Sequence, residues 1–181
     1  MSQRIMLTFS RGGRLTADLL EKKAPRTCDL ITRQLPLTGT SFHARWTGRE
    51  CFVPVKLRKK PDRENAQFLI SRGELMYWRE FEQTYGPHEM VGAEVIAFFY
   101  GPEYLRGEWR GYERGNVFAQ IPQSEWELME ELGTRIWKEG SEEIKVNLIR
   151  PARPPAPRKT SRKVSKRKAT ARKSSKKNSR G

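Results

Sequence analysis

His43 and Arg45 are the residues of this sequence best suited to recognising a small polar molecule. They alternate along a predicted strand, residues 41–46, so both side chains lie on one face of it. If residues 47–48 form a two-residue turn, Arg45 lies opposite Glu50 and His43 opposite Phe52 on the next strand. A guanidinium can clamp a carboxylate or a carbonyl group, and an imidazole exchanges a proton near neutral pH. The pattern predicts a pocket for a small carboxylate, amide or cyclic imide; the alternative is an exposed Arg–Glu pair beside a packed histidine.

Three further residues, Tyr77, Glu94 and Tyr100, are candidates for the same pocket. Either tyrosine can present its hydroxyl at the mouth of a β-barrel while its ring packs, although such tyrosines more commonly belong to the core. Glu94 interrupts the otherwise apolar residues 91–100. A strand glutamate usually lies on a solvated face, but if Glu94 points inward we expect its pKa to be perturbed.

Most named catalytic and metal sites are excluded by the sequence. The Cys and His residues are Cys28, Cys51, His43 and His88, and their spacing fits no zinc site. The sequence contains no Walker, G-x-S-x-G or G-x-G-x-x-G motif. We therefore expect neither a metal nor a cofactor. Two cysteines are too few for a disulfide framework, and the sequence shows no signal-peptide core or bilayer-spanning stretch, so we expect a cytoplasmic protein.

Hydrophobic periodicity indicates many strands and two helices. Alternating apolar residues predict strands over residues 4–10, 14–20, 41–46, 49–55, 74–78, 91–100, 116–121 and 145–149. Apolar residues at helical spacing predict helices over residues 25–35 and 124–140, the second beginning with a capping box of Ser124 and Glu127. Strands with helices at two widely separated points favour a mainly β fold, a closed antiparallel barrel with helices over its open ends.

Several segments resemble the cyclophilin fold, in which an E-x-A-P-x-T segment enters the first helix over the barrel. That segment is Glu21-Lys22-Lys23-Ala24-Pro25-Arg26-Thr27 in this chain. Residues 43–48, 73–78 and 98–102, HARWTG, GELMYW and FFYGP, are similar to those of small prokaryotic cyclophilin-like domains of unknown function. The resemblance covers about residues 4–145 and implies a cyclophilin-like barrel, but it names no reaction.

The resemblance does not extend to the residues of a prolyl isomerase. True cyclophilins place an arginine immediately after the histidine of an F-H-R strand, followed by F-M-x-Q. Here Ala44 follows His43, and residues 50–54 read ECFVP, without the Met and Gln. Because side chains alternate along a strand, the one-residue offset moves the guanidinium of Arg45 to the other face. We therefore expect no prolyl isomerase activity; the alternative is a β-bulge that corrects the offset and restores the arginine to the isomerase face.

Positive charge is concentrated at the C-terminus. The chain has 181 residues and a formal net charge of +15. Residues 150–181 hold fourteen of the 36 Lys and Arg residues and no acid, so residues 1–149 carry 22 basic residues against 21 acidic ones. We expect residues 1–149 to form one barrel domain and residues 150–181 to form a disordered tail, because the tail has too little apolar surface to fold.

Such a tail is suited to polyanions, because each neutralised phosphate releases counterions. We expect it to bind nucleic acid without sequence preference and to place the protein at the nucleoid. A merely solubilising extension is the alternative, and no apolar anchor favours a membrane. The tail residues expected to contact phosphates are Arg158, Lys159, Arg162, Lys163, Lys166, Arg167, Lys168, Arg172, Lys173, Lys176 and Lys177.

Two loops of the body are candidates for extending this basic surface. Residues 56–63 carry five Lys or Arg residues around Pro61. Residues 106–115 repeat Arg-Gly every four positions, with Trp109 and Tyr112 between them. Arginines and aromatic rings can stack on single-stranded bases, but the two glutamates of this segment favour a loop at the barrel rim instead.

Three functions are compatible with the sequence. The first is a small-molecule-binding barrel of unestablished activity that a basic tail tethers to nucleic acid. The second is a nucleoid- or RNA-associated protein in which the barrel is a platform. The third is a prolyl isomerase delivered to nucleic acid by the tail. The His43 and Arg45 pattern favours the first.

Overall fold

The computed structural model describes residues 2–80, 92–107 and 111–149. The chain divides into two units, Met1–Pro151 and Ala152–Gly181, and the first holds all the described residues. The predicted tail, with its candidate phosphate contacts, therefore lies outside the described residues, as do His88, Val91 and Trp109. No helix within the described ranges is long and apolar enough to span a bilayer.

The elements follow the predicted order, with several short strands in addition. The strands are β1 (Arg4–Phe9), β2 (Arg14–Leu19), β3 (Leu37–His43), β4 (Glu50–Pro54), β5 (Ala66–Gln67), β6 (Leu69–Ile70), β7 (Glu74–Arg79), β8 (Glu94–Phe99), β9 (Glu103–Tyr104), β10 (Arg106–Gly107), β11 (Gly111–Tyr112), β12 (Gly115–Gln120) and β13 (Glu142–Ile149). The helices are α1 (Pro25–Thr32), the short 3-10 helix η2 (Gln123–Glu125) and α2 (Trp126–Glu139).

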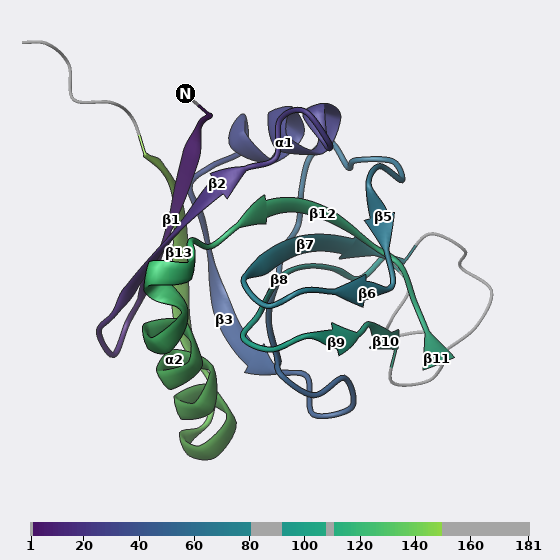
Figure 1. Cartoon of the computed structure of the whole chain (residues 1–181). Helices are drawn as coiled ribbons and strands as arrows, with labels where there is room; N and C mark the ends of the chain where they lie inside the picture. The colour runs from purple at the N-terminus through teal and green to yellow at the C-terminus, as the bar shows by residue number, and fades with distance from the viewer. Residues whose placement is uncertain (1, 81–91, 108–110, 150–181) are drawn as a thin grey trace, which may run out of the picture. The chain divides into compact units, whose positions relative to one another are not determined.

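Eight strands close into an antiparallel barrel, as predicted (Figure 1). Their order is β2-β1-β13-β3-β4-β8-β7-β12, and β12 returns to β2 through the pairs Ala119↔Leu19 and Gln120↔Asp18. Closure leaves no free edge among these eight strands, so their backbone groups pair within the barrel.

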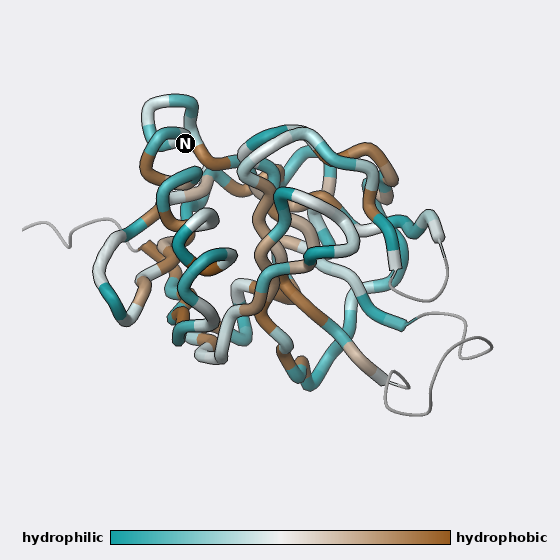
Figure 2. The backbone as a smooth tube through the Cα atoms, turned by 90° about the horizontal axis from the view of Figure 1, so that it is seen from below, coloured by the Kyte–Doolittle hydropathy of each residue, from teal (hydrophilic) through white to brown (hydrophobic). Residues whose placement is uncertain are grey.

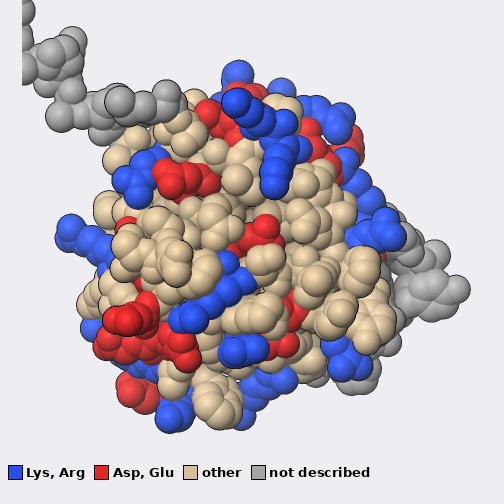
Figure 3. All heavy atoms as spheres, viewed as in Figure 1, with Lys and Arg blue, Asp and Glu red and all other residues tan. Residues whose placement is uncertain are grey.

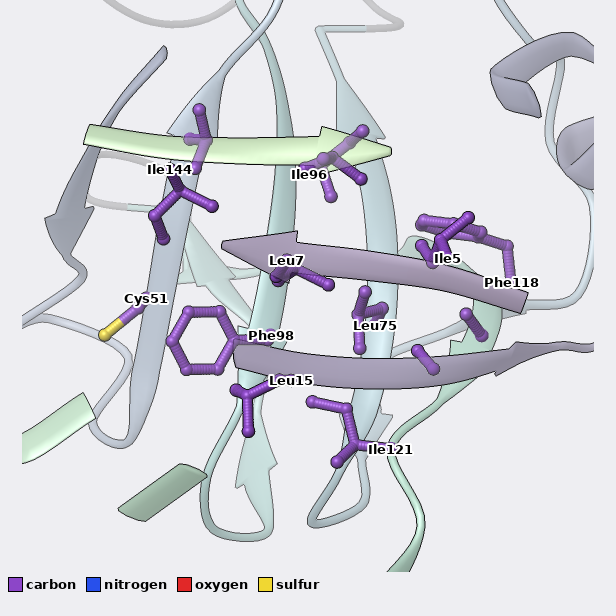
Figure 4. Packing of buried hydrophobic residues seen from close by; sticks show 14 of the residues in the cluster. Ile5, Leu7, Leu15, Cys51, Leu75, Ile96, Phe98, Phe118, Ile121 and Ile144 are labelled. Atoms are coloured by element: carbon purple, nitrogen blue, oxygen red, sulfur yellow. The ribbon is translucent and has the colours of Figure 1, made fainter. Parts of the chain in front are cut away.

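The barrel interior is the main core. Strands β1 and β2 alternate buried and less buried residues along their length, which is the period expected when one face is inside. Leu7, Leu15 and Phe98 point toward one another between the strands (Figure 4). Hydrophobic stretches gather in the middle of the molecule, while hydrophilic ones lie at its periphery (Figure 2). Both helices add to this core, α1 through Ile31 and α2 through Leu132.

A second, smaller core lies on the outer face of the barrel. Met76 and Val117 from the barrel strands pack there with Ile70 and Leu105. The latter two belong to an outer layer made by the β6–β9 and β10–β11 pairs. The sequence did not predict these short strands, because two residues are too few to show a period.

The start of α2 differs from the prediction. Ser124 lies in η2, and the cap of α2 is Glu125, with no side-chain capping bond, so the predicted capping box is wrong. The Glu125 carboxylate instead accepts hydrogen bonds from the amide of Thr16, over 2.6 Å, and from its hydroxyl. The helix ends at Gly140, as predicted, with φ +95°.

Candidate functional site

The connection between β3 and β4 is longer than the predicted two-residue turn. The amides of Thr47 and Gly48 both donate to the carbonyl of Ala44, over 3.0 and 3.1 Å. Gly48 has φ +119°, a left-handed conformation that side chains disfavour. The strand therefore ends at His43, and residues 44–49 form the connection.

This longer connection changes the predicted register and places Arg45 on the surface. His43 pairs with Cys51, one position away from the predicted partner, and Arg45 does not face Glu50. Its guanidinium donates to the carbonyl of Trp137 in α2 over 3.3 Å, and its side chain is exposed. The predicted pairing of Arg45 with Glu50 is therefore wrong.

A cavity of about 490 Å³ lies between the outer face of β4, β7 and β8 and the outer layer. This volume is within the range of small-molecule sites. Its apolar lining residues are Trp46, Phe52, Pro54, Val55, Met76, Trp78, Ala93, Val95 and Leu105. Its ionisable lining residues are Glu50, Lys56, Lys60, Glu94, Arg106 and Glu113.

Glu50 is the unusual residue of this cavity. Its side chain lies on the same face of β4 as Phe52, because residues two apart share a face, while Cys51 between them points into the barrel core. Glu50 is 4% exposed, and within the part of the chain that the structure describes its Oε2 atom has no hydrogen-bond partner. Burial raises the pKa of Glu50 to about 8, the Glu103 charge adds to the increase, and the Thr47 hydroxyl opposes it.

Glu94 is buried in the wall of the same cavity, but both of its carboxylate oxygens have partners. Its Oε2 accepts a hydrogen bond from the Tyr77 hydroxyl over 2.7 Å. Its Oε1 accepts the amide of Leu57 over 2.9 Å and lies 3.3 Å from Nζ of Lys60. Burial raises the pKa of Tyr77, and the hydrogen bond to Glu94 is the next cause. These contacts fix residues 57–60 to β8, which is a structural role.

His43 and Tyr100 form a separate pair beneath α2. Nε2 of His43 lies 2.6 Å from the Tyr100 hydroxyl, while its Nδ1 is buried and has no partner in the described ranges. Burial lowers the pKa of His43, and the nearby Arg45 charge lowers it further. Burial likewise raises the pKa of Tyr100 to about 12. The ring of Tyr100 belongs to the barrel core, so this pair is on the opposite side of the sheet from the Glu50 cavity.

The structure thus divides the six predicted residues among three places. Glu50 and Glu94 line the cavity, with the Tyr77 hydroxyl bound to Glu94; His43 and Tyr100 lie under α2; Arg45 is on the surface. Sequence reasoning missed the aromatic walls of the cavity. The available signal was that β7, ELMYWR, is apolar on both faces, which is typical of a strand covered on both sides.

The cavity combines apolar walls with one buried acid that can give or accept a proton near neutral pH. A protonated carboxyl presents a hydroxyl donor and a carbonyl acceptor side by side. Amides and imides present the complementary groups, a carbonyl acceptor beside an N–H donor. Across the described ranges, no group of three or more His, Cys, Asp or Glu side chains is placed to hold a metal ion.

Comparisons with solved structures support the fold. The chain is similar to McbB, solved in complex with tryptophan, with 18% identity and a TM-score of 0.56 over 83% of this chain and 46% of that one. The chain thus spans about half the length of McbB. It is also similar to the hypothetical protein AF2241 from Archaeoglobus fulgidus, with 18% identity and a TM-score of 0.52 over 82% of this chain and 95% of that one.

Comparisons of sequence show the family. No curated protein matches the chain. Residues 7–148, most of the chain, match a family described as "Protein of unknown function (DUF3830)". The chain therefore belongs to the DUF3830 family.

Proposed function

We propose that this chain is a small-molecule-binding barrel whose ligand lies in the Glu50 cavity. The observation that carries the proposal is the Oε2 atom of Glu50, buried in the wall of a 490 Å³ cavity without a hydrogen-bond partner among the described residues. An unsatisfied buried polar atom costs free energy, and a ligand that supplies the missing hydrogen bond recovers it.

The ligand class follows from the walls and from the acid. Trp46, Phe52 and Trp78 favour a flat, largely apolar molecule. Glu50 with a pKa of about 8 is mostly protonated at neutral pH, so it favours an amide or cyclic imide over a carboxylate. Small carboxylates are the second class, because Lys56 and Arg106 also line the cavity.

Thermal-shift measurements on the full chain test this proposal with a panel of cyclic imides, aromatic amides and matched carboxylates. A ligand that binds the folded state raises the melting temperature. We expect imides or amides to stabilise the wild type below about pH 8 and to lose their effect above it, as Glu50 ionises.

Substitutions at Glu50 separate binding from its dependence on pH. Glu50→Gln keeps a donor and an acceptor but cannot ionise, so its ligand response should persist at high pH. Glu50→Leu removes both groups and should remove the response. Arg45→Ala, on the surface beside α2, is the matched control and should respond as the wild type does. A response that survives Glu50→Leu, or a panel without a stabilising imide or amide, contradicts the proposal.

A second activity is proposed for the tail, because residues 150–181 hold fourteen basic residues and no acid. We infer that it binds nucleic acid without sequence preference and so tethers the barrel. The test is the salt dependence of duplex DNA binding by the full chain. Replacing Arg158, Lys159, Arg162 and Lys163 by Gln should make the fall of log K with log salt less steep, by about 0.9 in slope per lost phosphate contact. An unchanged slope contradicts the tether.

The cyclophilin-like character of the barrel stays a prediction, and so does the absence of prolyl isomerase activity. Arg45 lies on the surface beside α2 rather than after His43 on a barrel strand, which does not favour an isomerase site. The alternative is a nucleoid-associated protein in which the barrel is only a platform. It requires no ligand in the Glu50 cavity, so the thermal-shift panel distinguishes it from our proposal.

A further inference from the structure

Three exposed aromatic rings lie in a row on the outer layer. Phe68, Tyr104 and Tyr112 are 46%, 50% and 69% exposed. The rings of Phe68 and Tyr104 are stacked, with centroids 6.0 Å apart and planes at 19°. The Tyr112 ring follows, with its centroid 5.9 Å from that of Tyr104 and its plane at 66°. Since the rings come from three segments, only the folded outer layer brings them together.

The backbone holds these rings outward. Along residues 104–106, Tyr104 and Arg106 are exposed, while Leu105 between them packs into the smaller core. The amide of Leu105 donates to the carbonyl of Phe68 over 2.6 Å, and the amide of Glu113 donates to the carbonyl of Leu105 over 3.0 Å. Because the segments are tied together, a molecule that stacks on them meets a platform that is already ordered.

Basic side chains border the row of rings. The guanidinium carbon of Arg106 lies 5.6 Å from the ring centroid of Tyr112, and Arg114 lines a surface hollow with Phe68. Among the residues that the structure describes, neither arginine forms an ion pair with an acid, whereas nearby Glu103 is engaged by Arg49 at 3.0 Å. Figure 3 shows largely uncharged surface in the region of β6 and β9, with both basic and acidic residues in and around it.

We propose that Phe68, Tyr104 and Tyr112 form a binding site for single-stranded nucleic acid. Bases stack on the rings, and Arg106 and Arg114 contact the phosphates. The arginines beside the rings, Arg106 and Arg114, favour a polyanionic ligand over a protein partner, because neither forms an ion pair with a described acid. The site adds what the tail lacks, since residues 150–181 contain no aromatic side chain and cannot prefer single strands by stacking.

The test compares the affinities of the full chain for a labelled oligothymidylate and for a duplex of the same length, by fluorescence anisotropy at low and high salt. The tail contributes to both and weakens with salt, whereas stacking persists. Tyr112→Ala should weaken oligothymidylate binding on the order of tenfold and leave duplex binding unchanged. Tyr104→Ala should act in the same direction, and Tyr104→Phe should restore wild-type affinity.

Trp137→Ala is the matched control, because Trp137 is also 46% exposed but lies on α2. It should leave both affinities unchanged. The proposal is overturned if Tyr112→Ala leaves the single-strand affinity unchanged, if it weakens duplex binding equally, or if the wild type binds no oligothymidylate at high salt. Capture of a protein partner through the same rings, with no effect of Tyr112→Ala on oligothymidylate, is also a refutation.

Discussion

Replacing Glu50 by Gln should remove a large pH dependence from the stability of this protein. Burial raises the pKa of Glu50 from its ordinary 4.5 to about 8 in the folded chain. Between these values the folded state binds more protons at this site than the unfolded state does, so the free energy of unfolding falls as the pH rises. The full stability is present below the unfolded pKa and is lost progressively up to the folded pKa.

The magnitude follows from the size of the pKa difference. One pKa unit corresponds to about 1.4 kcal/mol, so the loss between about pH 5 and pH 8 amounts to about 3 to 4 kcal/mol. Glu50→Gln cannot ionise, and its stability relative to the wild type should therefore rise by that amount over the same interval. Urea denaturation followed by tryptophan fluorescence gives the free energy at each pH from the midpoint and the slope.

Glu131→Gln, on the exposed side of α2, controls for the loss of one negative charge. Its stability should follow that of the wild type across the pH range. If the difference between Glu50→Gln and the wild type does not change with pH, then Glu50 ionises as an exposed glutamate does. That result would refute both the effect of burial assigned to this side chain and the argument for an uncharged ligand.

Three further predictions concern buried groups other than Glu50. Tyr77→Phe leaves Oε2 of Glu94 without its donor and should cost about 1 to 3 kcal/mol in urea denaturation; an unchanged midpoint contradicts the role given to this bond. In NMR titration, His43 should have a pKa below its ordinary 6.5, and Arg45→Ala should raise it only in part, because burial is the larger cause. Cys28, whose pKa burial raises to about 12, should react with a thiol reagent only as fast as the chain opens; rapid labelling of the native chain refutes this.

The barrel was predictable because its strands are long enough to show their period. In β1, Ile5, Leu7 and Phe9 alternate with polar or less buried residues, and the closing strand β13 has the same alternation. A closed barrel suits strands of this kind, since it buries the apolar face that points inward and pairs both edges of each strand. The outer layer was not predictable in the same way, because β6, β9, β10 and β11 are two residues long, and β6 pairs with β9, which is distant in sequence.

The candidate site was only partly predictable, because register decides which residues meet. Glu50 was singled out as the partner of Arg45, and it is a cavity residue for another reason. The six residues between β3 and β4 fold around the carbonyl of Ala44, which removes Arg45 from the strand and changes the pairing of His43 by one position. The alternation of side chains in the sequence does not predict the hydrogen bonds to the Ala44 carbonyl. The sequence therefore indicated which residue types could form a site, but not which of them would meet.

The two buried carboxyls of the cavity show why burial alone does not identify a functional acid. Glu94 is as buried as Glu50, but a tyrosine hydroxyl, a backbone amide and a lysine satisfy it, so its burial is compensated within the protein. Glu50 has an oxygen that no described residue of the chain satisfies. A glutamine there would avoid ionisation, and an apolar residue would avoid the unpaired oxygen, so either would stabilise the fold better at neutral pH. The lower stability that comes with Glu50 is explained if a ligand in the cavity completes the hydrogen bonding of its carboxyl. An oxygen left for a ligand distinguishes Glu50, a binding acid, from Glu94, a structural acid in the same wall.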